Sequence, residues 1–124
     1  MAAINNINLD TTMTIAEGAS LSAAIDLKGA TAVGFITPAA IEATTVQLGF
    51  FSSNALDGTY VEVNKNGIPV TLTFAVDEYA LLENPTGLFG VRFLKIQAQT
   101  AAGVAVAQAT AARIFRVVKS IGLT

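Results

Sequence analysis

The chain has 124 residues, of which 52% are hydrophobic and 13% charged, and it contains no histidine, cysteine or tryptophan. Without these residues the sequence offers no Ser-His-Asp triad, no disulfide framework and no imidazole or thiolate ligand for zinc or copper. The formal net charge of −2 comes from charges scattered along the chain, so bulk electrostatics attract neither nucleic acid nor an anionic membrane.

The mean hydropathy of +0.58 is high for a chain whose apolar stretches fall far short of the roughly 20 residues that span a membrane. The first residues also lack the basic and apolar regions of a signal peptide. Many alanines and valines in a small sandwich would raise the hydropathy, but so would apolar surface buried between subunits, because interface cores are poor in charged residues. We expect one domain that assembles with other chains, and neither nucleic acid nor a membrane as a partner.

In residues 1–12, asparagine and aspartate alternate with isoleucine and leucine ahead of the first turn signal. This pattern predicts an extended N-terminal arm that adds to the sheet edge of a neighbouring molecule, with a frayed terminus as the alternative. The candidate contact residues of the arm are Ile4, Asn5, Asn6, Ile7, Asn8 and Leu9. Residues 13–124 are then expected to form a single β-sandwich domain.

Period-two alternation between turn residues predicts eight or nine short strands after the arm. The clearest strand is expected at residues 70–76, where four large apolar side chains share one face: Val70, Leu72, Phe74 and Val76. Asn66-Gly67 predicts a tight hairpin turn between this strand and one at residues 60–64. The remaining strands are expected at residues 13–15, 21–27, 32–36, 45–52, 78–82, 91–98 and 106–119, with one helical turn at residues 38–43. The fold class predicted is an all-β antiparallel sandwich.

The carboxylates are the remaining route to metal binding or catalysis. Asp77, Glu78 and Glu83 lie close in sequence, but they lack the alternate spacing and central glycine of a calcium loop, so a solvated strand edge is the simpler interpretation. A pair of carboxylates for glycoside hydrolysis needs no fixed spacing along the chain, so the sequence leaves that possibility open. We expect no enzyme activity, no catalytic or metal-binding residue and no cofactor.

Aromatic residues raise the possibility of carbohydrate binding, which needs no catalytic group. Tyr60, which follows the turn at Asp57-Gly58, is the candidate platform for a sugar ring, and a half-buried tyrosine at a strand end is the alternative. The predicted core includes the aromatic side chains of Phe35, Phe74 and Phe93.

The basic residues of the last predicted strand do not form a stripe. Strand periodicity places Arg113 and Lys119 on one face and Arg116 on the other. Ion pairs are therefore a better expectation for these residues than nucleic-acid binding.

The order of several motifs resembles a known group of proteins. The runs are IAEGASLSAAIDLKG at residues 15–29, AVGFITPAA at 32–40, VQLGF at 46–50, DGTYVEV at 57–63 and GVRFLKI at 90–96. Over residues 13–118 this order is similar to that of small β-sandwich virion proteins of tailed bacteriophages, of the capsid decoration (cement) or head-fibre type.

This resemblance implies a jelly-roll-like sandwich that is made in the host cytoplasm and located on the capsid surface of the virion. The implied partners are the major capsid protein, whose subunit contacts the protein would stabilise, and further copies of the chain in a trimer or dimer. It carries over no catalytic residue. The alternatives are a carbohydrate-binding or host-adhesion module displayed on the virion, and a tail, baseplate or fibre-base component.

Overall fold

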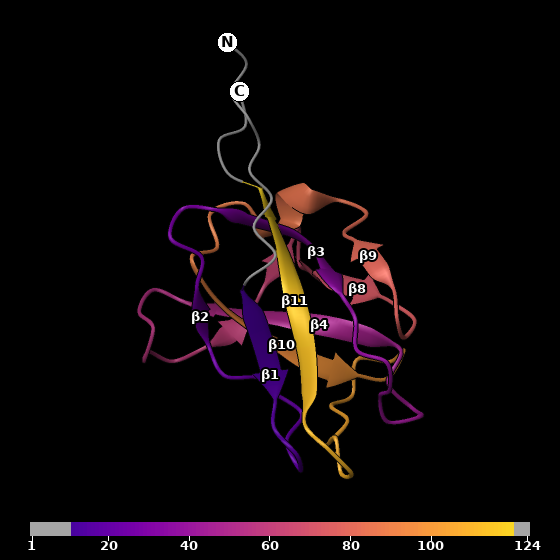
Figure 1. Ribbon diagram of the computed structural model, residues 1–124. Coiled ribbons are helices and arrows are strands. Elements are labelled where there is room, and N and C mark those ends of the chain that lie inside the picture. The colour runs from indigo at the N-terminus through magenta and orange to yellow at the C-terminus, as the bar shows by residue number, and fades with distance from the viewer. Residues whose placement is uncertain (1–10, 121–124) are drawn as a thin grey trace.

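Two antiparallel sheets pack face to face in the computed structural model of the protein, which describes residues 11–120 (Figure 1). Sheet A consists of four strands, in spatial order β1 (Thr12–Ile15), β11 (Arg113–Ser120), β3 (Thr31–Ile36) and β9 (Tyr79–Leu81). Sheet B has the order β2 (Ile25–Asp26), β10 (Phe93–Gln99) and β4 (Gln47–Ser53), followed by two short strands that both pair with β4, β5 (Val61–Glu62) and β8 (Thr71–Thr73). The predicted all-β antiparallel sandwich is confirmed.

A small hairpin projects between β5 and β8. Its strands are β6 (Asn64–Lys65) and β7 (Ile68–Pro69), and the turn residues Asn66 and Gly67 have φ values of 55° and 77°. Positive φ at both central positions is what a type I′ turn requires, and asparagine and glycine accept it at low cost. The hairpin turn predicted at Asn66-Gly67 is confirmed.

The helical segment of the described chain is a 3-10 helix, η1 (Pro85–Leu88), and not the turn predicted at residues 38–43. The Asn84 side chain caps η1 by accepting a hydrogen bond from the Thr86 N–H. At the predicted position, the Pro38 carbonyl instead accepts a hydrogen bond from the Asp77 N–H (2.9 Å). That carbonyl is used to hold the chain ahead of β9, so residues 38–43 do not continue into a helix.

Two pairs of aromatic rings lie at the centre of the core. Phe35 of β3 stacks on Phe50 of β4, with ring centroids 5.7 Å apart, and Phe74 meets Phe115 of β11 edge to face at 5.6 Å. The predictions for Phe35 and Phe74 are therefore correct. The prediction for Phe93 is wrong, because the inward positions of β10 are the buried Leu94, Ile96 and Ala98, and period two turns Phe93 to the opposite face.

Three predicted strands are shorter than expected because the chain leaves one sheet for the other there. The strand at residues 21–27 reduces to β2, that at 70–76 to β8, and that at 106–119 to β11. In each case the residues that are missing from the strand lie in or beside a connection that joins sheet A to sheet B. These connections are residues 16–24, 74–78 and 100–112. Val76, expected on the core face, lies in the second connection with its side chain 42% exposed.

Buried hydroxyl groups fix the first two of these connections. The Ser22 hydroxyl accepts a hydrogen bond from the Ile96 N–H (2.9 Å), which ties the first connection to β10. The Thr37 hydroxyl accepts from the Glu78 N–H (2.7 Å) and donates to the Ala75 carbonyl (2.7 Å), which fixes the second. Both side chains take the place of backbone partners that a regular strand would have supplied.

Gln108 fixes the third connection and is fully buried. Its Oε1 atom accepts from the Glu42 N–H (3.0 Å), and its Nε2 atom donates to the Thr45 hydroxyl (3.1 Å) and the Val106 carbonyl (3.2 Å). One side chain therefore holds residues 42–45 against the irregular segment that precedes β11. A residue in this position must both donate and accept hydrogen bonds, as a side-chain amide does.

Replacing this amide is expected to destabilise the fold. Gln108→Ala should lower the free energy of unfolding by about 2–4 kcal/mol, because the Glu42 N–H and the buried Thr45 hydroxyl lose their partner. Equilibrium urea unfolding measures the change. The control is Thr59→Ala, an exposed position in the loop before β5, which should cost less than about 1 kcal/mol. Equal losses in the two variants would contradict the role assigned to Gln108.

Candidate interaction surface

The arm residues predicted to make contacts, Ile4, Asn5, Asn6, Ile7, Asn8 and Leu9, lie outside the described residues. The described chain begins beside sheet A. The Thr11 carbonyl accepts from the Val117 N–H (2.9 Å), its hydroxyl accepts from Lys119 Nζ (2.7 Å), and β1 begins at Thr12. The last two residues that the sequence placed in the arm therefore pair with or belong to sheet A.

Tyr60 lies half-buried next to the outer face of sheet B. Its hydroxyl donates to the Leu56 carbonyl (2.7 Å), and Lys95 Nζ lies 4.5 Å from the centroid of its ring. Burial raises the pKa of Tyr60, and the nearby carboxylates of Asp57 and Asp26 raise it further. These contacts brace the loop before β5 against β10. The role of Tyr60 as a sugar platform stays a prediction.

A cation also covers the neighbouring aromatic ring of this face. The Arg92 guanidinium carbon lies 5.0 Å from the centroid of the Phe93 ring. The same guanidinium binds both carboxylate oxygens of Asp26, at 3.0 Å from Nε and 3.1 Å from Nη2. The hydrogen bond from Arg92, followed by one from the Lys28 N–H, lowers the pKa of Asp26.

Glutamines fill the other part of the outer face of sheet B. Gln47 Nε2 donates to Gln99 Oε1 (2.9 Å), and Gln99 Nε2 donates to Gln97 Oε1 (3.0 Å). Gly49 makes room for this row, because a Cβ atom there would collide with the Gln99 amide. The side-chain amides of these glutamines therefore serve as hydrogen-bond partners for one another.

The basic residues of β11 lie on the predicted faces. Arg113 turns inward, with its side chain 12% exposed and its Nη2 atom 3.5 Å from Glu42 Oε2, and Lys119 is also buried. Arg116 lies exposed on the opposite face. The expected alternation is confirmed. The expected ion pair is found for Arg113, whereas the Lys119 ammonium group donates to the Thr11 hydroxyl.

The outer face of sheet A has a different composition. Strand register places Thr12, Arg116, Ile36 and Tyr79 in one row across its four strands. We call Ile36, Tyr79, Leu81 and Ile114 the apolar face of sheet A, because they share this side of the sheet. Tyr79 is 50% exposed, Leu81 59% and Ile114 55%. Among the described residues that the register puts on this face, Arg116 is the only charged one.

The strand predictions from the sequence missed this face, although the sequence contains a signal for it. Residues 79–82 read Tyr-Ala-Leu-Leu, so both faces of the strand expected there are apolar. A strand with apolar residues on both faces is typical of burial on both sides. Here one side faces the core, and the other side is exposed.

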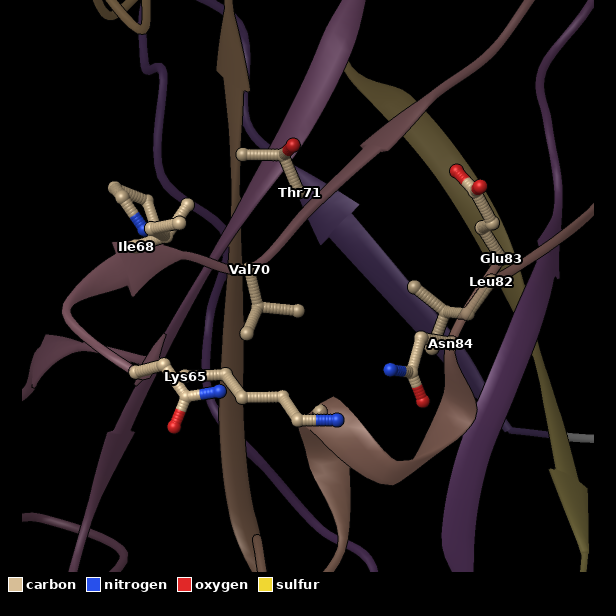
Figure 2. A pocket seen from close by; sticks show the side chains of 10 residues that line it. Lys65, Ile68, Val70, Thr71, Leu82, Glu83 and Asn84 are labelled. Carbon is tan, nitrogen blue, oxygen red and sulfur yellow. The ribbon is translucent and has the colours of Figure 1, made fainter.

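A pocket of ≈ 630 Å³ lies between the β6–β7 hairpin, β8 and η1. Figure 2 shows Val70 and Leu82 facing into it and Lys65 extending along its side towards η1. The Lys65 ammonium group is already engaged, because Nζ donates to the Thr86 hydroxyl (2.7 Å).

In residues 11–120 we find no cluster of three potential ligands for a metal ion, and no helix of this range has the length and apolarity to cross a membrane.

Comparison of the chain with protein-family models, with curated proteins and with solved structures finds no match. The resemblance to phage virion proteins therefore stays a prediction from the motifs of the sequence.

The ion pair on sheet B has a measurable consequence. The carboxyl group of Asp26 should titrate below its ordinary pKa of 3.8, and Arg92→Gln should raise that pKa, because its main hydrogen-bond donor is lost. A lowered pKa favours the folded state above the ordinary value, and this contribution disappears as the pH falls through the pKa of the folded protein. NMR titration of the side-chain carboxyl carbon gives both values. Arg113→Gln serves as the control, and an unchanged Asp26 titration in Arg92→Gln would contradict the assignment.

Proposed function

We propose that this protein is a structural virion component that decorates the outside of a tailed-phage head and stabilises contacts between major capsid subunits. It is made in the host cytoplasm and acts on the capsid surface as a trimer or dimer. The order of motifs over residues 13–118 supports this proposal, and so does the all-β sandwich.

The order of the strands in the two sheets supports the jelly-roll topology that the resemblance implies. Consecutive strands β1, β2, β3 and β4 alternate between sheets A and B, and β8, β9, β10 and β11 alternate in the same way. The resulting orders, β1-β11-β3-β9 and β2-β10-β4-β8, interleave the two halves of the chain in both sheets. Two interleaved sets of four strands are the arrangement expected of a jelly roll.

The observation that carries the proposal is the contrast between the two outer faces. On sheet B, cations cover Phe93 and Tyr60, and glutamines bind one another. On sheet A, large apolar side chains are exposed side by side. An exposed apolar face on a small domain is typical of a surface that binds other proteins. Many copies on one shell would gain avidity even if each contact were weak.

Decoration of shells tests the proposal. Purified protein should bind heads that lack it, and electron microscopy should show it at regular positions on the outer surface. Deleting residues 2–10 should abolish binding while circular dichroism shows a folded domain, because the deletion removes the predicted contact residues and spares β1. Gln97→Ala should decorate normally. Full occupancy by the truncated protein would rule out the arm contact, and no binding by the intact protein would rule out the proposed function.

A further inference from the structure

Strand β9 is an edge of sheet A whose backbone is arranged to accept another strand. The Leu82 N–H donates to the Val33 carbonyl (2.9 Å), and the Thr37 N–H donates to the Glu78 carbonyl (2.8 Å). In an antiparallel ladder, hydrogen-bonded and non-hydrogen-bonded pairs alternate, so residues 78, 80 and 82 face β3. Tyr79 and Leu81 therefore direct their N–H and C=O groups away from the sheet, towards the open side.

The same two residues contribute side chains to the apolar face of sheet A. Tyr79 pairs with Ile36, and Leu81 pairs with Gly34, where the side chain of Leu81 occupies the space that a Cβ atom would need. A strand added along β9 would make backbone hydrogen bonds and would also extend apolar contact over Tyr79 and Leu81. Backbone pairing and side-chain contact together are how strand addition gains affinity and specificity.

The edges at β1 and β8 are less suited to such a partner. At β1, the Thr14 carbonyl already accepts from the Ala23 N–H (3.4 Å), so the chain itself covers part of that edge. At β8, Thr71 and Thr73 also point their backbone groups outward, but the side chains beside them are hydroxyls and not an apolar surface.

Acidic residues bracket β9 and indicate the charge of its partner. Asp77 and Glu78 precede the strand, and Glu83 follows it. Pairing of β9 with the same strand of a second copy, centred on Ala80, would bring the acidic residues that precede the strand in each copy close to Glu83 of the other. Like charges placed opposite each other destabilise strand pairing, whereas lysine or arginine at these positions would stabilise it. The charges therefore disfavour a second copy and favour a basic segment.

We propose that an extended segment of another protein, apolar at alternate positions and carrying lysine or arginine at both ends, adds as a strand to β9 and covers Tyr79 and Leu81. Only the identity of the partner as a shell protein rests on the proposed function. The strand addition itself depends on the edge, the apolar face and the flanking carboxylates.

The direct test uses the peptide Lys-Thr-Val-Thr-Val-Thr-Lys, whose lysines and valines share one face of the strand, as the probe and the intact, isotope-labelled protein. NMR titration should shift the amide signals of Tyr79 and Leu81 and slow their hydrogen exchange, because both N–H groups gain a partner. A matched peptide with glutamate at both ends should bind more weakly. Shifts centred on β8 or on sheet B, or no binding at all, would overturn the proposal.

Proline substitution separates backbone pairing from other effects. Leu81→Pro removes an N–H that β3 does not use, as edge strands tolerate, and should weaken peptide binding about tenfold. Leu81→Ala keeps the N–H and should lose less. The matched control, Thr73→Pro, removes the outward N–H of β8 and should leave binding unchanged. Because wild-type mapping does not need these variants, the proposal stays testable if one of them fails to fold.

Charge neutralisation tests the choice of partner. Asp77→Asn combined with Glu83→Gln should weaken binding of the lysine-ended peptide about threefold, and added salt should reduce this difference. Glu17→Gln combined with Glu62→Gln changes the net charge equally at exposed sites away from β9 and serves as the control. Equal effects of the two double variants would overturn the role of the bracketing carboxylates, and dimerisation of the wild-type protein through β9 without peptide would overturn the choice of partner.

Shell decoration distinguishes failure of this inference from failure of the proposed function. If Leu81→Pro decorates shells at full occupancy, strand addition to β9 is wrong as the shell contact, while the virion role stands. If the wild-type protein binds the peptide at β9 but decorates no shell, the docking edge stands and the proposed function is wrong.

Discussion

Three buried polar side chains fix three of the crossings between the two sheets of this sandwich. The chain passes from one sheet to the other beside Ser22, Thr37 and Gln108, and each side chain binds backbone groups that would otherwise lie in the core without partners. An unsatisfied buried polar group costs more than a typical hydrogen bond contributes, so these contacts set the positions of the crossings. The crossings in turn decide which residues reach each outer face.

Exposed aromatic and aliphatic residues have different surroundings on the two outer faces of this domain. Arg92 and Lys95 lie over the rings of Phe93 and Tyr60, so these rings meet a cation and not open solvent. Tyr79 and Leu81 have no such cover among the contacts described above and share their side of the sheet with Ile36. The difference follows from where the basic residues lie: Arg92 covers its neighbour Phe93, and Lys95 covers Tyr60. On β9 both outward positions, Tyr79 and Leu81, are apolar or aromatic, and no basic residue lies between them.

Local patterns in the sequence predicted the fold class, the Asn66-Gly67 turn and the alternation of Arg113, Arg116 and Lys119. They failed where tertiary contacts decide the outcome. Residues 106–112 were predicted as part of the last strand, but Gln108 binds Glu42, Thr45 and Val106, and these contacts hold the chain out of the sheet there. Apolar alternation at residues 70–76 likewise gave no sign that Thr37 would hold the segment after Phe74 away from the sheet. The edge position of β9 depends on which strands pair, and periodicity does not encode that.

One of the two inner strands of each sheet comes late in the chain. In sheet A, β11 lies between β1 and β3, and in sheet B, β10 lies between β2 and β4 (Figure 1). While the ribosome is still adding residues before 93, β1 has no neighbour in sheet A and β2 has none in sheet B. Pairs such as Thr12 with Arg116 join distant parts of the chain, and such topologies fold slowly. Sheet A therefore cannot be completed until β11 has been made, and sheet B cannot be completed until β10 has been made.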